Sequence, residues 1–191
     1  MSRIGLFGGS FDPVHLGHIL VAQAACEEFQ LDEIHFIPAA RSPFKPDQQP
    51  APDGRRLQML RLALAGEPRM HVDQVELDRG GVSYTIDTVR HFEGRFSDAK
   101  LFWLIGADHV PTLDKWRNSE ALASALEFLV IPRPGEAPAN APGGFITHRL
   151  RGFPLGVSSS EIRERVPRDL PIRHLTGSAV AEVIRNNGLY L

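Results

Sequence analysis

Short apolar runs alternate along this chain with segments in which apolar residues recur every three or four positions. Runs at residues 2–7, 33–38, 100–105 and 127–132 are typical of buried strands, and we expect further strands over 70–77 and 145–148. The three-to-four-residue spacing predicts helices over 18–29, 53–65, 89–96 and 178–187. Strands separated by single helices pair in parallel through right-handed crossovers. The pattern therefore predicts an α/β fold.

The expected architecture is a Rossmann-like, doubly wound fold with a mainly parallel sheet and a small C-terminal helical subdomain. With 191 residues, of which 42% are hydrophobic, the chain is long enough for one substantial core. We expect a single domain over 1–191, with the Rossmann-like core at 1–155 and the helical part at 156–191. Residues 100–105 form the most apolar run, so we expect that strand at the centre of the sheet, with Trp103 in the core.

The charge and the cysteine content narrow the class of protein. A net charge of −2 argues against a dedicated nucleic-acid binder, which normally carries a basic excess, but it does not exclude a small anionic substrate. The only cysteine, Cys26, has no partner for an internal disulfide, so we expect a cytoplasmic protein with a buried thiol. The first residues lack the layout of a signal peptide, and no apolar run approaches the length of a membrane span.

The first predicted strand ends in a glycine turn that leads into the first predicted helix. Gly8 and Gly9 form the turn, and His15 and His18 follow at the helix start in the spacing His-x-Gly-His. At such a start, unpaired backbone N–H groups and the positive end of the helix dipole face one spot and favour an anion. The two imidazoles add side-chain donors there. This stretch therefore predicts phosphate chemistry without naming the substrate.

A second helix start lies near residue 158. Ser158 and Glu161 have the spacing of a capping box, Ser159 adds a further hydroxyl, and Arg163 is close to the first turn. One interpretation is a capped helix that carries a surface arginine. The other is a second group of donors for an anion.

Other candidates follow the predicted strands, at the edge of the sheet where open α/β folds bind ligands. They are Lys45 in the proline-rich loop 39–53, Thr85, Gly106 with Asp108, Trp116 and Arg133. Structural interpretations stay open for several of them. Lys45 can be a solvated loop residue, Ser83 or Thr85 can cap the helix that follows, Asp108 can cap the next helix, and Trp116 either packs a loop or stacks on a flat ring.

Taken together, these motifs resemble a known family. Residues 8–18 resemble the His-x-Gly-His nucleotidylyltransferases, and the later motifs narrow the resemblance to the bacterial nicotinate mononucleotide adenylyltransferases. Those later motifs are residues 42–45, 83–88, 106–108 with Leu113 and Trp116, 133–135, 157–163 and 187–190. They are spread along nearly the whole chain. One departure is Phe44, where many relatives have a histidine before the lysine.

The resemblance implies that the chain transfers the adenylyl group of ATP to nicotinate mononucleotide, giving nicotinate adenine dinucleotide and pyrophosphate in NAD biosynthesis. The phosphate of the acceptor would attack the α-phosphorus in line, so the protein would position two anions and stabilise charge, with no covalent nucleophile. Mg²⁺ is the implied cofactor, held mainly by ATP phosphates and water rather than by a metal site of the protein.

The resemblance also implies a role for each matching residue. The catalytic residues would be His15, His18 and Arg163. The ATP-binding residues would be Gly8, Gly9, Ser10, Phe11, His15, His18, Gly106, Asp108, Ser158, Ser159, Ile162 and Arg163. The residues for nicotinate mononucleotide would be Lys45, Thr85, Trp116 and Arg133.

Two alternatives to this reading remain open at the level of the sequence. The acceptor could be nicotinamide mononucleotide or phosphopantetheine, or the chain could be a nucleotide-sensing module without turnover. We expect ATP and the mononucleotide as the partners, no nucleic acid or membrane partner, and a monomer or small homo-oligomer.

Overall fold

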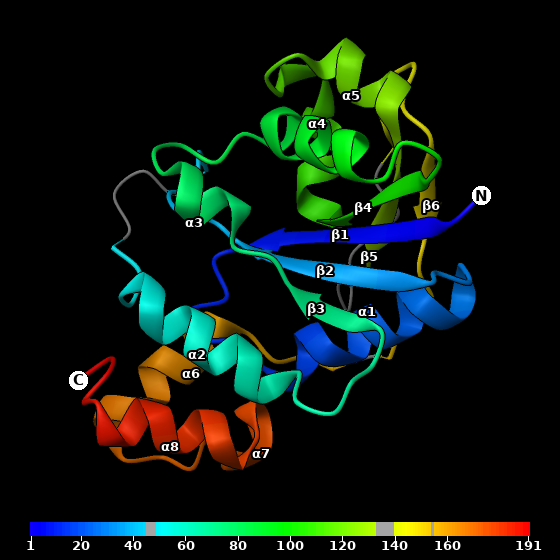
Figure 1. Ribbon diagram of the computed structural model, residues 1–191. Coiled ribbons are helices and arrows are strands. Elements are labelled where there is room, and N and C mark those ends of the chain that lie inside the picture. The colour runs from blue at the N-terminus through cyan, green and yellow to red at the C-terminus, as the bar shows by residue number, and fades with distance from the viewer. Residues whose placement is uncertain (45–48, 133–139, 154) are drawn as a thin grey trace.

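The computed structural model describes residues 1–44, 49–132, 140–153 and 155–191. Its centre is a six-stranded sheet with the order β3-β2-β1-β4-β5-β6 (Figure 1). The strands are β1 (Arg3–Gly9), β2 (Glu33–Pro38), β3 (Met70–Val72), β4 (Lys100–Gly106), β5 (Leu126–Ile131) and β6 (Thr147–Arg149). All five pairings are parallel. The prediction of an α/β fold with a mainly parallel sheet is confirmed, and the most apolar strand, β4, is central as expected.

Helices cover both faces of the sheet. Figure 1 shows α4 (Thr85–Arg95) and α5 (Ser119–Ala125) above it, and α1 (Leu16–Glu28), α2 (Asp53–Ala63) and α8 (Ser178–Asn186) below it. Each face has its own cluster of buried apolar side chains. One cluster contains Cys26, Met59 and Ile184, and the other contains Val89, Trp103 and Leu122. Cys26 and Trp103 are therefore buried, as their apolar neighbours predict.

The order of the strands fixes where a ligand site can form. The chain moves outward from β1 to β2 and β3, then returns to add β4 on the other side of β1. Connections therefore diverge at the carboxyl ends of β1 and β4, and a crevice forms at such a point in open α/β sheets. The turn at residues 10–13, which follows β1, and the segment after β4, which begins the 3₁₀ helix η1 (Ala107–Lys115), come together there. The prediction that Gly8 and Gly9 form this turn is wrong, because both glycines still pair with β2 as the last residues of β1.

The predicted strand over 70–77 is wrong in its second half. Only Met70–Val72 is strand, and residues 75–79 form the short helix α3 (Val75–Arg79). The last ladder contact is the Asp73 N–H donating to the Phe36 carbonyl, after which the Asp73 carboxylate accepts from the Val75 N–H at 3.0 Å. This Asx-type turn redirects the backbone into a helix.

The next helix begins earlier than its apolar spacing predicts, at Thr85 rather than Val89. Neither Ser83 nor Thr85 caps it, because the residue before the helix is Tyr84 and no side chain bonds the free amides of this start. The Ser83 hydroxyl accepts instead from the Ala40 N–H at 3.0 Å. The Ser83 hydroxyl therefore bonds the backbone of a distant loop instead of capping the helix.

The C-terminal segment consists of α6 (Ser159–Arg165), the 3₁₀ turn η2 (Val166–Arg168), α7 (Arg173–Thr176) and α8. Val180, Val183 and Ile184 of α8 are buried in the same apolar cluster as α1 and α2. Figure 1 shows this segment, in orange and red, lying beside α2, with the C-terminal end returning next to α6. Among the described residues, no helix is long and apolar enough to cross a membrane.

Candidate active site

A cavity of about 1020 Å³ lies at the carboxyl edge of the sheet. Twelve residues that the sequence singles out for substrate binding line it. They are Gly8, Gly9, Ser10, Phe11, His15, His18, Thr85, Gly106, Asp108, Trp116, Ser158 and Ser159. The motifs that are scattered along the sequence therefore meet in one space. Lys45 and Arg133 lie outside the described residues.

Close packing shapes the end of β1 and the turn that follows it at residues 10–13. A Cβ on Gly8 would lie 2.6 Å from the Trp103 ring, so only glycine lets β1 run this close to that side chain. Phe11 has φ +45°, an uncommon value for a bulky residue, and its ring packs on Phe7 and on the His18 ring. Strain of this kind persists where the surroundings impose it, and it is often found at functional sites.

The two histidines form a stacked pair at the start of α1. Their ring centroids are 3.7 Å apart, and the His15 backbone N–H donates to Nδ1 of His18 at 3.2 Å. Because Nδ1 of His18 accepts, the proton of the neutral ring is on Nε2. His18 lines the cavity, so its Nε2–H is a donor available to a ligand there.

Burial keeps both rings neutral in the free protein. Desolvation lowers the pKa of His15 to about 4, and it holds the pKa of His18 well below its ordinary value, with repulsion from His15 as a second cause. Nδ1 of His15 is buried and has no hydrogen-bond partner among the described residues. A buried polar atom costs free energy when it is unpaired, so a ligand that pairs it gains that energy. A bound phosphate would favour the charged imidazole for the same electrostatic reason that burial disfavours it.

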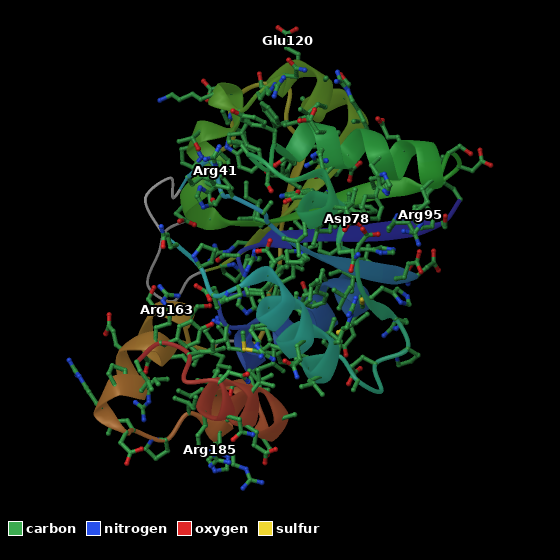
Figure 2. The ribbon with its side chains drawn as sticks, turned by 60° about the vertical axis from the view of Figure 1, so that its left-hand side comes forward. Arg41, Asp78, Arg95, Glu120, Arg163 and Arg185 are labelled. Atoms are coloured by element: carbon green, nitrogen blue, oxygen red, sulfur yellow. The ribbon has the colours of Figure 1, made fainter. Side chains whose placement is uncertain are left out.

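The second helix start is tied directly to the first. Ser158 caps α6, because its Oγ accepts from the Glu161 N–H at 3.1 Å, which confirms the predicted cap. The Ser159 hydroxyl donates to the Pro13 carbonyl at 2.8 Å. Nη1 of Arg163 donates to the Asp12 carbonyl at 2.7 Å (Figure 2 labels this arginine on α6).

Two predicted ATP ligands on α6 are absent from the described cavity lining. Ile162 is fully buried beneath the helix, and the Arg163 guanidinium is engaged with the Asp12 carbonyl and with Oγ of Ser160. In the free protein Arg163 therefore holds the turn from outside the cavity. Its role toward pyrophosphate stays a prediction.

The other end of the cavity is aromatic. Three rings gather there, with the Phe44 centroid 4.7 Å from that of His109 and 5.4 Å from that of Trp116. Nε1 of Trp116 is buried without a hydrogen-bond partner among the described residues. Thr85 lines the same cavity at the start of α4. Flat rings and uncapped helix amides suit a ligand that is planar and bears a negative group.

Gly106 and Asp108 line the cavity at the carboxyl end of β4. A Cβ on Gly106 would lie 2.6 Å from Oδ1 of Asp108, so glycine lets this carboxylate lie against the backbone at the end of β4. The helix η1 begins after Gly106 without a side-chain cap, which removes the capping interpretation of Asp108. A carboxylate at this position suits a ribose hydroxyl.

Sequence reasoning missed several residues that line the cavity. Glu76 is buried, and its Oε1 accepts from the Thr88 hydroxyl at 2.6 Å; burial raises the pKa of this carboxyl group. Glu76 was missed because residues 70–77 were predicted as one strand, whereas Glu76 lies on the helix α3. Arg149, Arg151 and Phe153 also line the cavity. They follow the predicted strand 145–148, so the carboxyl-edge rule used for the other strands would have found them.

The comparisons with known proteins agree with this geometry. Residues 6–165 match the model of the cytidylyltransferase-like family. A probable nicotinate-nucleotide adenylyltransferase of Opitutus terrae is 43% identical, over 98% of this chain and 97% of its own. One of Bordetella petrii is 42% identical over the full length of both. Among solved structures, a Plasmodium falciparum nicotinic acid mononucleotide adenylyltransferase complexed with NaAD has a TM-score of 0.81 at 16% identity, covering 100% of this chain and 98% of that one.

The match of residues 6–165 to the cytidylyltransferase-like family, together with the parallel sheet and the histidine pair at its first strand-to-helix turn, identifies the chain as a nucleotidyltransferase. The chain belongs to the cytidylyltransferase-like family and, within it, to the nicotinate-nucleotide adenylyltransferases.

Proposed function

We propose that this chain transfers the adenylyl group of ATP to nicotinate mononucleotide, with nicotinate adenine dinucleotide and pyrophosphate as the products. The observation that carries the proposal is one cavity with two chemically different ends. At one end, the imidazoles of the histidine pair and the backbone N–H groups of the turn at residues 10–13 are donors for phosphates. The aromatic cluster of Phe44, His109 and Trp116 supplies flat surfaces for a pyridine ring at the other. Family membership through relatives above 40% identity supports the same acceptor.

The reaction needs positioning more than acid–base chemistry. The acceptor phosphate oxygen forms a bond to the α-phosphorus of ATP while the bond to the β-phosphate oxygen breaks in line, and pyrophosphate leaves. Negative charge accumulates on the transferring and leaving oxygens. Nε2–H of His18 and the unpaired nitrogen of His15 stabilise that charge, His15 after taking up a proton. The Thr85 amide and the Trp116 ring orient the acceptor.

Mg²⁺ fits this site as an ion carried by the substrate. Of the described residues that line the cavity, only Glu76 and Asp108 bear carboxylates, and Glu76 is already bonded to Thr88. The described part of the chain holds no group of three metal-ligating side chains. We therefore propose that the ion is held by the triphosphate and water, where it would neutralise phosphate charge.

Location and assembly complete the proposal. The single cysteine is buried, which suits a reducing compartment, and we propose a cytoplasmic enzyme. We propose that it acts as a monomer or small homo-oligomer.

The decisive experiment mixes the protein with ATP, Mg²⁺ and one acceptor at a time, and measures pyrophosphate release. Nicotinate mononucleotide should give the highest kcat/KM. A higher kcat/KM with nicotinamide mononucleotide or phosphopantetheine would identify that compound as the acceptor instead. If the protein bound ATP but released no pyrophosphate with any acceptor, it would be a nucleotide sensor.

A further inference from the structure

The turn at residues 10–13, which carries the phosphate-binding amides, is held by side chains of other segments, and two of these side chains lie outside the described cavity lining. Three carbonyl oxygens of the turn accept hydrogen bonds from other segments: that of Ser10 from Arg56, that of Asp12 from Arg163 and that of Pro13 from Ser159. Arg56 and Arg163 are both absent from the described cavity lining. Arg56 of α2 and Arg163 of α6 therefore hold the turn from outside the cavity, whereas Ser159 holds it from within the lining.

Arg56 is the unusual member of this set. It is fully buried and is the largest side chain in the core to be so. Nη1 donates to the Ser10 carbonyl at 2.9 Å, Nε donates to the Ala51 carbonyl at 3.2 Å, and Nη2 is paired with the Asp53 carboxylate. A charged group is costly to bury unless it is fully bonded, and the planar guanidinium satisfies several acceptors at once.

The bond to Ser10 has a geometric consequence for the turn. In a trans peptide the C=O of one residue and the N–H of the next point in opposite directions. Arg56 draws the Ser10 carbonyl into the core, so the Phe11 N–H points the other way. Phe11 lines the cavity, and its positive φ of +45° is part of the same conformation.

A second hydrogen bond reaches the turn from the C-terminal segment. The Tyr190 hydroxyl donates to Oδ1 of Asp12 at 2.7 Å, and the same oxygen accepts from the Ala51 N–H at 3.1 Å. Asp12 is buried. Tyr190 has φ +67°, which is rare for an aromatic residue, and this conformation persists where the surroundings hold it. Burial and the contact with Asp12 raise the pKa of Tyr190, so its hydroxyl remains a proton donor.

We propose that Arg56 and Tyr190 are positioning residues for the transfer reaction: from behind the turn, they fix the backbone that presents the Phe11 N–H to the phosphates of ATP. This inference deepens the proposed function and rests on it. The two residues make no contact with substrate. They act through the Ser10 carbonyl and the Asp12 carboxylate, and they belong to the ATP end of the cavity alone.

The mildest test is Tyr190→Phe, which removes one hydroxyl and keeps the ring. We expect kcat/KM for ATP to fall about tenfold, which corresponds to the loss of one hydrogen bond of about 1.4 kcal/mol, while KM for the acceptor stays unchanged. The matched control is Ser178→Ala, which removes a hydroxyl that accepts from Nε of Arg173 on the surface of the same segment. The control should retain kcat/KM for ATP.

The second test compares Arg56→Lys with Arg56→Met. Lysine keeps the charge without the planar fork, and methionine keeps only the bulk. We expect both to lose kcat/KM for ATP, methionine by about a hundredfold, since the Ser10 carbonyl loses its anchor in each. Wild-type kcat/KM for ATP in the lysine variant would overturn the geometric role of Arg56.

Two further measurements separate positioning from folding and from the identity of the reaction. Thermal unfolding of Tyr190→Phe should stay within a few degrees of wild type; a loss of kcat/KM that only follows a loss of folded protein, or equal losses for ATP and the acceptor, would overturn the proposal. Calorimetric titration with ATP needs no acceptor, so weaker binding in Tyr190→Phe would support the positioning role even if the assigned acceptor proved wrong. ATP affinity equal to that of Ser178→Ala would overturn it.

Discussion

The two ends of the cavity are built on opposite plans. At the ATP end, the turn is fixed by hydrogen bonds from Arg56, Ser159, Arg163 and Tyr190, all made before any ligand is present. At the acceptor end, the Phe44 ring is 48% exposed, and the indole N–H of Trp116 is buried without a partner among the described residues. The backbone of the ATP end is therefore already fixed by hydrogen bonds, whereas side chains at the acceptor end are exposed or lack a hydrogen-bond partner.

Because of this difference, we expect the ATP end to determine the rate of the transfer and the acceptor end to determine which acceptor is used. A preorganised turn stabilises developing charge without reorganising during the reaction, and that is where electrostatic catalysis gains most. An end with exposed rings and an unsatisfied donor gains its contacts from the ligand, so differences among acceptors are felt there. Variants at the ATP end should therefore lower kcat/KM for ATP, and variants at the acceptor end should mainly raise KM for the acceptor.

The largest expected effect is at His18. His18→Ala removes the Nε2–H donor from the cavity, and we expect kcat to fall by two or more orders of magnitude, because loss of a single charge-stabilising donor costs about 10²–10³ in comparable sites. Circular dichroism and thermal unfolding should remain close to wild type. A kcat within about threefold of wild type would remove His18 from the ATP end.

A smaller and differently directed effect is expected at Trp116. Trp116→Ala removes the largest ring of the aromatic cluster, and we expect KM for the acceptor to rise about tenfold, since ring stacking contributes about 1–3 kcal/mol in comparable nucleotide sites. Steady-state kinetics with each substrate varied in turn measures this. An equal rise in KM for ATP would show that the tryptophan supports the whole cavity rather than one end.

The pH dependence of stability should reveal the buried histidine pair. The pKa of His15 is lowered to about 4, so the unfolded chain binds more protons than the folded one between pH 6.5 and pH 4. The free energy of unfolding should therefore fall as the pH drops through this window, by at most about 1.4 kcal/mol per pH unit for each such histidine. Urea denaturation at several pH values should show a shallower dependence in His15→Gln, and an unchanged slope in that variant would contradict the assignment.

The smallest effect is expected at Phe44, the one departure from the family pattern. Phe44→His introduces the histidine that the family resemblance leads us to expect before Lys45, beside His109 and Trp116. We expect KM for the acceptor to change by no more than about threefold, because one exposed aromatic ring replaces another. A change of more than tenfold would mean that this side chain contacts the acceptor directly.

The sequence predicts those parts of the site whose signal is local. Gly8, Gly9 and the two histidines lie within one strand-to-helix unit, and the structure brings them to the cavity, although the glycines end β1 rather than forming the turn. The parallel sheet follows from the periodicity in the same way. The cap assigned to Ser83 or Thr85 was wrong because the decisive partner, the Ala40 amide, comes from another loop.

The remaining parts depend on contacts between distant segments. Arg56 has the spacing of an ordinary surface arginine on a helix, and nothing around it indicates that its guanidinium is fully buried. Glu76 was not recognised as a cavity residue because the alternation of apolar and polar residues predicts a strand over 70–77, whereas the strand ends at Val72. In both cases the side chain has a bonding partner on another segment, Ser10 for Arg56 and Thr88 for Glu76, which no local pattern indicates.

Three of the hydrogen bonds that hold the turn join residues that are far apart in the sequence, by 146, 151 and 178 positions. The entropy lost on closing a loop grows with the logarithm of its length, so these bonds are among the costliest in the chain to close. Contacts of such high sequence separation also slow folding. We therefore expect enzymatic activity to be the last property to return on refolding and the first to disappear in mild denaturant, when the sheet is still intact.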